Sequence, residues 1–322
     1  MKSVWHKILR VNLSTGTCKP EEVPDRVYEY FLGGAGLIAW VLYKECPAGT
    51  KAFDPENRLT FAVGPLQGLK QTGAAKWSAG AISPSINMNS EAAATASWGI
   101  ELKKTGHDAI IVHGKADKPV YIVVEDDRVE IKDASHLWGR DAYDASDAIK
   151  EAEGDKFEVI SIGQAAEKLV RYANIQTSKK SFLGRCGLGA VMGSKLLKGI
   201  AVRGTQICPI HDPEEIDRLN NSINRRLAEV DSSKPKEKCW SYGGTAIATA
   251  LFAPQGNLPV KNYQLATFPN GVKEFDGVNY VEELDAKPWP CPKCVIGVIT
   301  CAKSRKGLTP TRVKGRSMSL LP

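Results

Sequence analysis

The chain has 322 residues, of which 43% are hydrophobic and 25% are charged, and its formal net charge is +7. This composition is that of an ordinary globular protein and excludes a disordered, fibrous or collagen-like chain. The length is sufficient for about two domains. No apolar run approaches the roughly 18–20 residues of a membrane span, and no secretory signal opens the sequence. We therefore expect a cytoplasmic protein that does not enter a membrane.

The positive charge is concentrated in one short segment. Residues 298–322 contain six basic residues and no acidic one, whereas the other 297 residues carry 37 basic against 36 acidic residues. Lysines and arginines without aromatic side chains make a poor platform for nucleic acid. We therefore expect no nucleic-acid partner.

The first 200 residues alternate short strands with helices. We predict a hairpin over 120–125 and 128–132, and a turn or short helix over 192–198. Further strands are expected over 7–13, 18–23, 58–63, 76–82, 109–113, 157–162 and 199–202, and helices over 25–32, 37–44, 101–104 and 143–153.

The pattern changes near residue 210. Asp212 is a suitable N-cap, Pro213 follows at the first helical position, and apolar residues then recur at helical spacing. Residues 231–238 are polar and expected to be exposed, and 243–251 can form a second helix. The fold class is therefore predicted to be α+β. We expect a β-rich domain over 1–210, the beginning of a helical domain over 211–297, and a basic tail over 298–322.

Cys291-Pro-Lys-Cys294 is the only close cysteine pair that also lies in a proline-rich loop. Two thiolates at this spacing can bind one metal ion or two corners of an iron–sulfur cube, which needs four ligands. The pair alone is compatible with zinc, a redox dithiol, an iron–sulfur cluster or incidental thiols.

A glycine-rich segment extends from Gly184 to Gly193. Its backbone N–H groups could approach a bound anion, with Arg185 pairing with phosphate and Lys195 adding charge. The alternative is a tight turn that packs a short helix on a sheet, and spacing alone favours it. Lys76, which follows Thr72-Gly-Ala-Ala, could lie over a cofactor or be a solvated surface lysine.

These features occur together, in the same order, in one family. The motifs are Arg10–Gly16, Gly64–Gly68, Ile100–Lys103 with Gly106–Ile110, Asp133–Gly139, Ser161–Gly163, Gly184–Lys195, Val260–Tyr263 and the Cys291/Cys294 pair. Over residues 1–297 the chain resembles the aldehyde ferredoxin oxidoreductases. The resemblance implies a tungsten (or molybdenum) bis-pterin enzyme that oxidises aldehydes to carboxylic acids and passes electrons through a [4Fe-4S] cluster to ferredoxin. A homodimer is compatible with it.

The resemblance also implies positions for the cofactor. Its β-rich domain would form the base for the pterins, with contacts at Lys76, Ala93, Thr95, Ser181, Phe182, Gly184 and Arg185. Lys76 replaces an arginine and so lacks the planar bidentate fork. Ala93–Ala96 replaces Asn-Ser-Gly-Gly, and Ser181 replaces another arginine. The family's catalytic proton-handling residues belong to later domains, so catalytic residues are unknown here and this chain alone is expected to be inactive.

The resemblance implies Cys291 and Cys294 as cluster ligands, but the third cysteine of the family's motif is replaced by Val298, and Cys301 comes three residues too late. A one-base slip of the reading frame after Gly297 would restore a cysteine at 298. We therefore expect a frameshifted gene with a disordered tail and a chain ending about halfway through the family's length. The alternative function is a non-catalytic binding or electron-transfer subunit that retains the pterin-domain fold.

Overall fold

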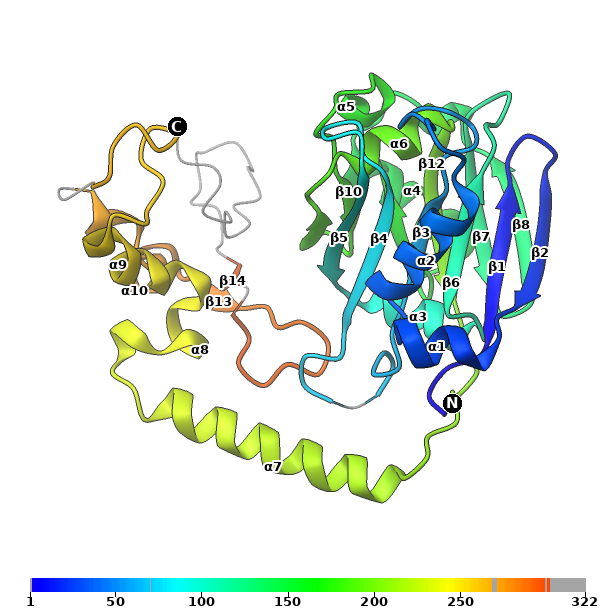
Figure 1. Cartoon of the computed structure of the whole chain (residues 1–322). Coiled ribbons are helices and arrows are strands. Elements are labelled where there is room, and N and C mark those ends of the chain that lie inside the picture. The colour runs from blue at the N-terminus through cyan, green and yellow to red at the C-terminus, as the bar shows by residue number, and fades with distance from the viewer. Residues whose placement is uncertain (1, 70, 268–270, 299, 302–322) are drawn as a thin grey trace. The chain divides into compact units, whose positions relative to one another are not determined.

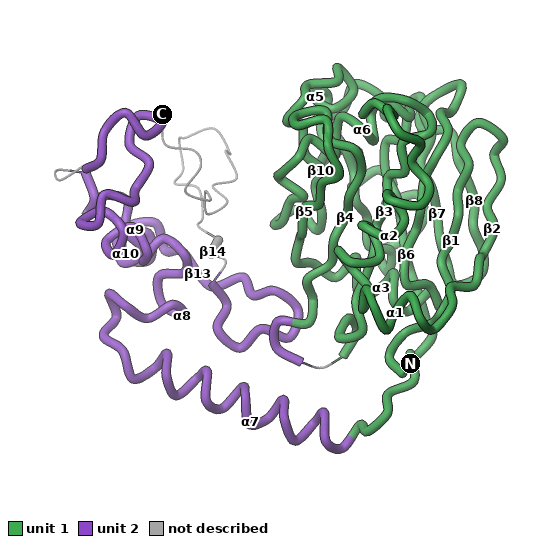
Figure 2. The backbone as a smooth tube through the Cα atoms, viewed as in Figure 1, with its two compact units in different colours: residues 1–69, 74–213 green, residues 70–73, 214–322 purple. Residues whose placement is uncertain are grey.

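The structure, a computed structural model, describes residues 2–69, 71–267, 271–298 and 300–301. The chain divides into two compact units, which Figure 2 shows in different colours. Unit 1 comprises residues 1–69 and 74–213, and unit 2 comprises residues 70–73 and 214–322. The division lies three residues beyond the expected position, and the short loop 70–73 belongs to the second unit.

Unit 1 contains two mixed six-stranded sheets (Figure 1). The first has the order β2 (Thr17–Glu22), β1 (Lys7–Asn12), β6 (Ala109–His113), β3 (Leu59–Ala62), β4 (Lys76–Ile82) and β5 (Asn89–Thr95). The second has the order β11 (Ser181–Leu183), β10 (Ile175–Thr177), β9 (Glu158–Ser161), β12 (Leu197–Arg203), β7 (Val120–Glu125) and β8 (Arg128–Asp133). Each sheet has one parallel pair, β1 with β6 and β12 with β7, and its other pairs are antiparallel. The expected α+β fold is confirmed.

The helices of unit 1 cover the outer faces of the sheets or complete the core between them (Figure 1). Helices α1 (Asp25–Phe31) and α2 (Ala35–Glu45) pack on the outer face of the first sheet. The 3-10 turn η1 (Ser135–Leu137) and α4 (Ala142–Glu153) pack on the outer face of the second. Both α3 (Ser97–Lys104) and α6 (Leu188–Ser194) contribute apolar side chains to the core that the sheets share, and α5 (Gln164–Glu167) packs on α6.

A buried ion pair fastens the N-terminal segment to the first sheet. Asp108 is fully buried, and one of its oxygens accepts hydrogen bonds from the backbone of Trp5 (2.8 Å) and His6 (2.9 Å) and from the Tyr28 hydroxyl (2.8 Å). Its other oxygen accepts a 2.5 Å bond from Lys103 Nζ, itself 2% exposed. Burial and the Asp108 charge raise the pKa of Tyr28 well above its ordinary value. Four donors thus compensate one buried carboxylate.

Unit 2 is mainly helical over its described residues. Its elements are α7 (Pro213–Ser232), η2 (Lys236–Lys238), α8 (Trp240–Gly243), η3 (Gly244–Ile247), α9 (Ala248–Phe252), η4 (Ala253–Gln255), η5 (Val272–Phe275), α10 (Gly277–Leu284), β13 (Lys287–Pro288) and β14 (Thr300–Cys301). Of the expected tail 298–322, only Val298 and β14 lie within the described residues. Over the described part of the chain, no helix is long and apolar enough to cross a membrane.

Two sequence-based expectations for unit 2 need correction. Residues 231–238 are not uniformly exposed, because Asp231 is 4% exposed and accepts hydrogen bonds from the backbone of Trp240 (2.8 Å) and Ser241 (2.9 Å). The carboxylate thereby fixes the turn after α7. In addition, the helix expected over 243–251 is divided into η3 and α9, since Gly243 packs against the backbone of Gly277 in α10.

Candidate cofactor-binding site

The expected pterin positions lie along the border between strands β5 and β11. Lys76 at the start of β4 pairs in register with Thr95 at the end of β5. The backbone N–H of Thr95 donates to Ser181 Oγ of β11 over 3.2 Å. Strand β5 is an edge of the first sheet and strand β11 is an edge of the second, so the hydroxyl of Ser181 links the two sheet edges. Lys76, Thr95 and Ser181 are therefore brought together from three separate segments.

The outward face of β5 consists mostly of small side chains. Glu91 and Ala93 are exposed and Thr95 is half-buried, while the intervening Ala92 and Ala94 belong to the core between the sheets. This alternation follows from the two-residue period of a strand. The small side chains project little from the strand, so a flat ligand can approach its backbone closely.

Glu91 was not predicted as a functional residue. Its Oε1 accepts a hydrogen bond of 2.5 Å from Ser78 Oγ on the neighbouring strand β4. Glu91 lies two residues before Ala93 and therefore on the same face of the strand, which could have identified it. The run of alanines, however, hides the two-residue alternation of a strand in the sequence. Glu91 is the acidic side chain on the exposed face of β5.

The loop that carries Gly184 and Arg185 is tied to the β4–β5 hairpin. Cys186 Sγ donates to the Glu91 carbonyl over 3.6 Å, and the Cys186 carbonyl accepts a 2.8 Å bond from Ser83 Oγ. Cys186 is half-buried and packs against the shared core. These bonds place the loop beside the Glu91 end of β5, whereas Ser181 lies beside the Thr95 end.

The glycines of the segment 184–193 have two different roles. A Cβ at Gly187, Gly189 or Gly193 would lie 1.9–2.3 Å from a backbone carbonyl oxygen, so these three glycines allow α6 to pack against segment 166–174. The packing interpretation is therefore right for them. At Gly184, by contrast, the nearest heavy atom to a Cβ is 4.0 Å away and the residue is exposed. Only Gly184 leaves open space for a ligand to approach its backbone.

Two cationic side chains on this surface have no partner in the described part of the chain. Lys76 and Arg185 are exposed, and the side chain of neither forms an ion pair or hydrogen bond with a described residue. They lie toward opposite ends of the segment Glu91–Thr95, which spans about 13 Å at the usual rise of a strand. Positive charges at this spacing, flanking a surface of small residues, suit an extended ligand with anionic groups.

Phe182 is placed differently from its neighbours. Its ring makes an edge-on contact with Tyr143 of α4, with the ring centroids 6.3 Å apart. Because successive side chains of a strand point to opposite faces, Phe182 and Ser181 are directed to opposite sides of β11. The hydrogen bond to β5 comes from Ser181.

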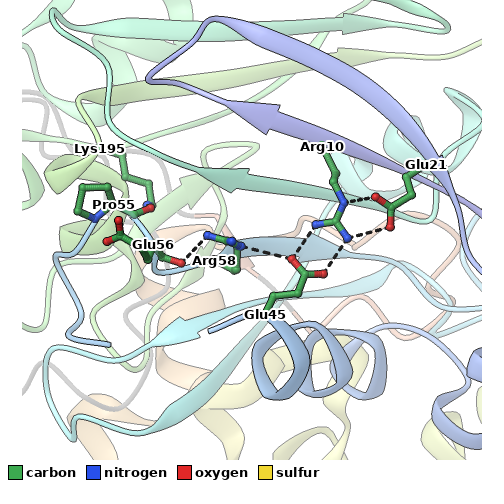
Figure 3. Close-up of polar contacts among 7 residues, drawn as sticks. All are labelled: Arg10, Glu21, Glu45, Pro55, Glu56, Arg58 and Lys195. Atoms are coloured by element: carbon green, nitrogen blue, oxygen red, sulfur yellow. Dashed lines mark hydrogen bonds and ion pairs between the residues drawn. The ribbon is translucent and has the colours of Figure 1, made fainter. Parts of the chain in front are cut away.

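Lys195 does not contribute charge to this surface, contrary to the sequence-based expectation. Its side chain is 1% exposed, and its ammonium group donates to the carbonyls of Pro55 (3.0 Å) and Gly114 (3.2 Å), as Figure 3 shows in part. Burial and the positive charge of Arg58 lower the pKa of Lys195 to about 8. The lysine stabilises two loops in the interior, because the turn after α6 directs it inward.

A second charged cluster lies near Lys195. Figure 3 shows that Arg10 bridges Glu21 and Glu45, and that Arg58 also donates to Glu45 (3.3 Å). A hollow of about 290 Å³ lies beside Arg10, between β1, β2 and β6. However, the guanidinium already donates to both carboxylates and has little capacity left for an anion. The cluster therefore fixes the end of α2 to the sheet and does not form a second anion site.

In unit 2, the two cysteines occupy a tight turn. The backbone N–H of Cys294 donates to the Cys291 carbonyl over 3.1 Å, and Lys293 has a positive φ of 62°. This is the geometry of a type II turn. The Gly297 N–H points at Cys294 Sγ over 3.5 Å. Both thiols are half-buried and neither is in a disulfide.

Thr72 holds this turn in place and was not predicted to do so. Its hydroxyl lies 2.9 Å from the Lys293 carbonyl and also contacts Asn224 Oδ1, while its backbone N–H donates to Asn220 Oδ1 over 3.1 Å. Both asparagines belong to α7. This clasp, formed by Thr72, Asn220, Asn224 and the Lys293 carbonyl, fastens the cysteine turn to the helix.

The residues present do not fit a complete [4Fe-4S] cluster. A cubane needs four ligands, whereas the described residues contain no group of three or more His, Cys, Asp or Glu side chains that could hold a metal. At the third position, Val298 has an apolar side chain, and its carbonyl accepts a hydrogen bond from Thr245 N–H (3.2 Å). The Cys301 side chain lies outside the described residues.

The comparison with protein-family models decides the classification of the chain. Residues 8–204 match the model described as the N-terminal domain of aldehyde ferredoxin oxidoreductase. The chain belongs to this family. The resemblance inferred from the sequence motifs is thereby confirmed.

Aldehyde ferredoxin oxidoreductases from two organisms are among the similar proteins. The tungsten-containing aldehyde ferredoxin oxidoreductases of Pyrococcus furiosus and Thermococcus kodakarensis are each 36% identical over 299 residues, which is 91% of this chain and 48% of theirs. The WOR-like subunit of a Pyrococcus furiosus aliphatic sulfonate oxidoreductase is 30% identical over 291 residues. The chain thus spans about half the length of the relatives it matches.

A solved structure shares the fold. It is the active site complex BamBC of benzoyl coenzyme A reductase, in complex with 1,5-dienoyl-CoA. The matched chain has a TM-score of 0.78 and 28% sequence identity, and the match covers 96% of this chain and 48% of that one. The named proteins, an aldehyde ferredoxin oxidoreductase, an aliphatic sulfonate oxidoreductase and a benzoyl coenzyme A reductase, are all oxidoreductases, and their names give different substrates.

Proposed function

We propose that this chain forms the pterin-binding base of a tungsten (or molybdenum) oxidoreductase that converts aldehydes to carboxylic acids with ferredoxin as electron acceptor. The observation that carries this proposal is the surface on the β5–β11 border. It combines two cationic side chains that have no partner among the described residues, an exposed Gly184 and a row of small side chains. This set suits a flat cofactor bearing phosphate groups.

The roles of the individual residues follow from their chemistry. Lys76 and Arg185 would neutralise cofactor phosphates, with Arg185 able to bind two oxygens at once. Gly184 would allow its backbone N–H to approach an anion. Ala93 and Thr95 would support the ring system through contact, and Ser181 holds the end of β5 in place. Among the described residues, then, this surface binds and orients the cofactor and excludes water from one of its sides.

When bound, the metal–pterin group supplies the two-electron chemistry by which an aldehyde and water give a carboxylic acid, two electrons and two protons. Cys291 and Cys294 would supply two of the four thiolates of a [4Fe-4S] cluster in the family's arrangement. The set is incomplete in this chain, so no electron-transfer step through a cluster is derived for it. We accordingly expect no aldehyde-dependent viologen reduction by the purified 322-residue chain.

Cofactor loading tests the proposal directly. The chain is produced in a host that makes tungstopterin, and the bound pterin is released by acid oxidation and quantified by fluorescence. We expect K76A/R185A to lower the pterin content at least tenfold, since two charge-assisted contacts are lost. The double variant R26A/K115A, which removes two exposed cations elsewhere, should load normally. Equal loading of both variants would contradict the proposal.

A second candidate function is a non-catalytic binding or electron-transfer subunit with the same fold. The observation that favours it is the incomplete cysteine set, with Val298 at the third position. Metal analysis distinguishes the two functions. Tungsten with about four irons per chain supports the enzyme, because a cubane holds four, and a chain that carries neither supports the subunit. Native mass spectrometry of the same samples would show whether a homodimer forms.

A further inference from the structure

The surface on the β5–β11 border carries a carboxylate as well as cationic side chains. Glu91 lies on the outward face of β5, two residues before Ala93 and four before Thr95. It faces Gly80 of β4 in register, and α2 fills the space above Gly80, because a Cβ there would lie 2.4 Å from Ile38 Cγ2. The Glu91 side chain therefore extends diagonally along the sheet toward the next residue of that face of β4.

A hydroxyl group fixes the end of this side chain. Glu91 Oε1 accepts a hydrogen bond of 2.5 Å from Ser78 Oγ, and Ser78 is 8% exposed. Ser78 is paired in register with Ala93, so the carboxylate is held beside Ala93. The Cα of Lys76 lies on the same face of β4, about 7 Å further along the strand. The Glu91 carboxylate is therefore part of the proposed cofactor surface.

We propose that Glu91 recognises the cofactor's ring by accepting hydrogen bonds from its 2-amino-4-oxo-pyrimidine edge. This inference rests on the proposed function, since it needs a pterin on this surface. That edge of a pterin carries two neighbouring donors, the ring N3–H and the 2-amino group. A carboxylate has two acceptor oxygens and can bind both donors side by side. Glu91 is thus a specificity-determining residue, whereas Lys76 and Arg185 would bind the phosphates.

The chemistry of the ligand explains why an acidic side chain suits this position. A carboxylate repels phosphate but attracts N–H groups, so Glu91 suits the part of the ligand that donates hydrogen bonds. The Ser78 hydroxyl uses one lone pair of Glu91 Oε1, and a carboxylate has about four. This hydrogen bond also restricts the side chain before the ligand arrives, which lowers the entropic cost of binding.

A matched pair of ligands tests the inference. The full 322-residue chain is titrated with the phosphate ester of 6-hydroxymethylpterin and with that of 6-hydroxymethyllumazine, in which a carbonyl oxygen replaces the 2-amino group. Binding is followed by the change in ligand fluorescence. We expect wild-type protein to bind the pterin about 10–100-fold more tightly, because the lumazine oxygen would face the carboxylate. E91Q should prefer the lumazine, since its amide can donate to that oxygen and accept from N3–H.

Three further variants serve as controls. K76A should weaken the binding of both ligands equally and leave the preference for pterin unchanged, since both ligands carry the same phosphate. S78A should reduce the preference for pterin about threefold, because it removes the hydrogen bond that positions the carboxylate. E22Q neutralises an exposed carboxylate on β2 of the same sheet and should change neither affinity.

The outcomes separate this inference from the proposed function. If wild-type protein binds the two ligands with equal affinity and K76A/R185A binds neither, the phosphate contacts stand and the role of Glu91 is wrong. If E91A binds both ligands more tightly by the same factor, Glu91 is only a counter-ion of the cationic side chains, which also overturns the inference. Failure of wild-type protein to bind either ligand overturns it as well, and failure to load tungstopterin overturns the proposed function in addition.

Discussion

The buried pair Lys103–Asp108 offers a quantitative test of what holds unit 1 together. Replacing Asp108 with asparagine removes the negative charge but preserves the size of the side chain. Lys103, at 2% exposure, would then be a buried ammonium without its counter-ion. Breaking one partner of such a pair costs about 3–5 kcal/mol. For a unit of this size, that loss lowers the melting temperature by about 10 °C or more.

Urea unfolding followed by tryptophan fluorescence measures the effect. Trp77 and Trp98 both lie in the core between the two sheets, with ring centroids 4.4 Å apart, so their emission reports on unit 1. K103M/D108N removes both charges, and we expect it to recover about 2 kcal/mol of the loss in D108N. The reasoning is refuted if D108N loses less than about 1 kcal/mol, or if the double variant is as unstable as the sum of the single ones.

Three further predictions concern other parts of the chain. Burial, followed by the charge of Lys7, lowers the pKa of His107 in the folded chain to about 4. Between pH 4 and 6.5 the unfolded chain therefore binds more protons than the folded chain. The free energy of unfolding is then highest above pH 6.5 and decreases as the pH falls to 4. The decrease in the free energy of unfolding amounts to about 3 kcal/mol, and unfolding experiments at pH 6.5 and pH 4 should show no such decrease for H107L. G187A should lower the stability of unit 1 by more than about 3 kcal/mol, because its φ is +66° and its Cβ meets a carbonyl, whereas G184A should change it by less than about 0.5 kcal/mol; similar thermal midpoints for the two would contradict this. D231A should lower the stability of unit 2 by about 1–3 kcal/mol, since two backbone N–H groups lose their acceptor, and hydrogen exchange after α7 should then accelerate.

Much of unit 1 could be predicted from the sequence because its elements are short and clearly delimited. Strand β4 and strand β6 were predicted with their observed bounds, and the hairpin of β7 and β8 ends one residue later than expected. Strand β5 was missed. Its sequence, Asn-Ser-Glu-Ala-Ala-Ala-Thr, has low strand propensity and no visible alternation, and its pairing with β4 is what makes it a strand.

The candidate site could be predicted only in part, and for a physical reason. Lys76 and Arg185 were identified as candidates for binding an anion, but the sequence cannot show that Lys195 points inward toward two carbonyls. Nor can glycine spacing distinguish Gly184, which faces open space, from Gly187, which meets backbone. These differences depend on which segments pack nearby, which is a property of the tertiary structure.

The clasp at Thr72 has a consequence for how the protein folds and how it can be divided. The hydroxyl of Thr72 and the carbonyl of Lys293 are separated by 221 positions in sequence. Contacts of such separation close large loops and form late. Since loop 70–73 is synthesised long before α7 and the cysteine turn, Thr72 gains all of its partners only after both have been made. A chain cut after residue 213 would retain the loop but lose Asn220, Asn224 and the cysteine turn, so a single cut at this point leaves the clasp incomplete.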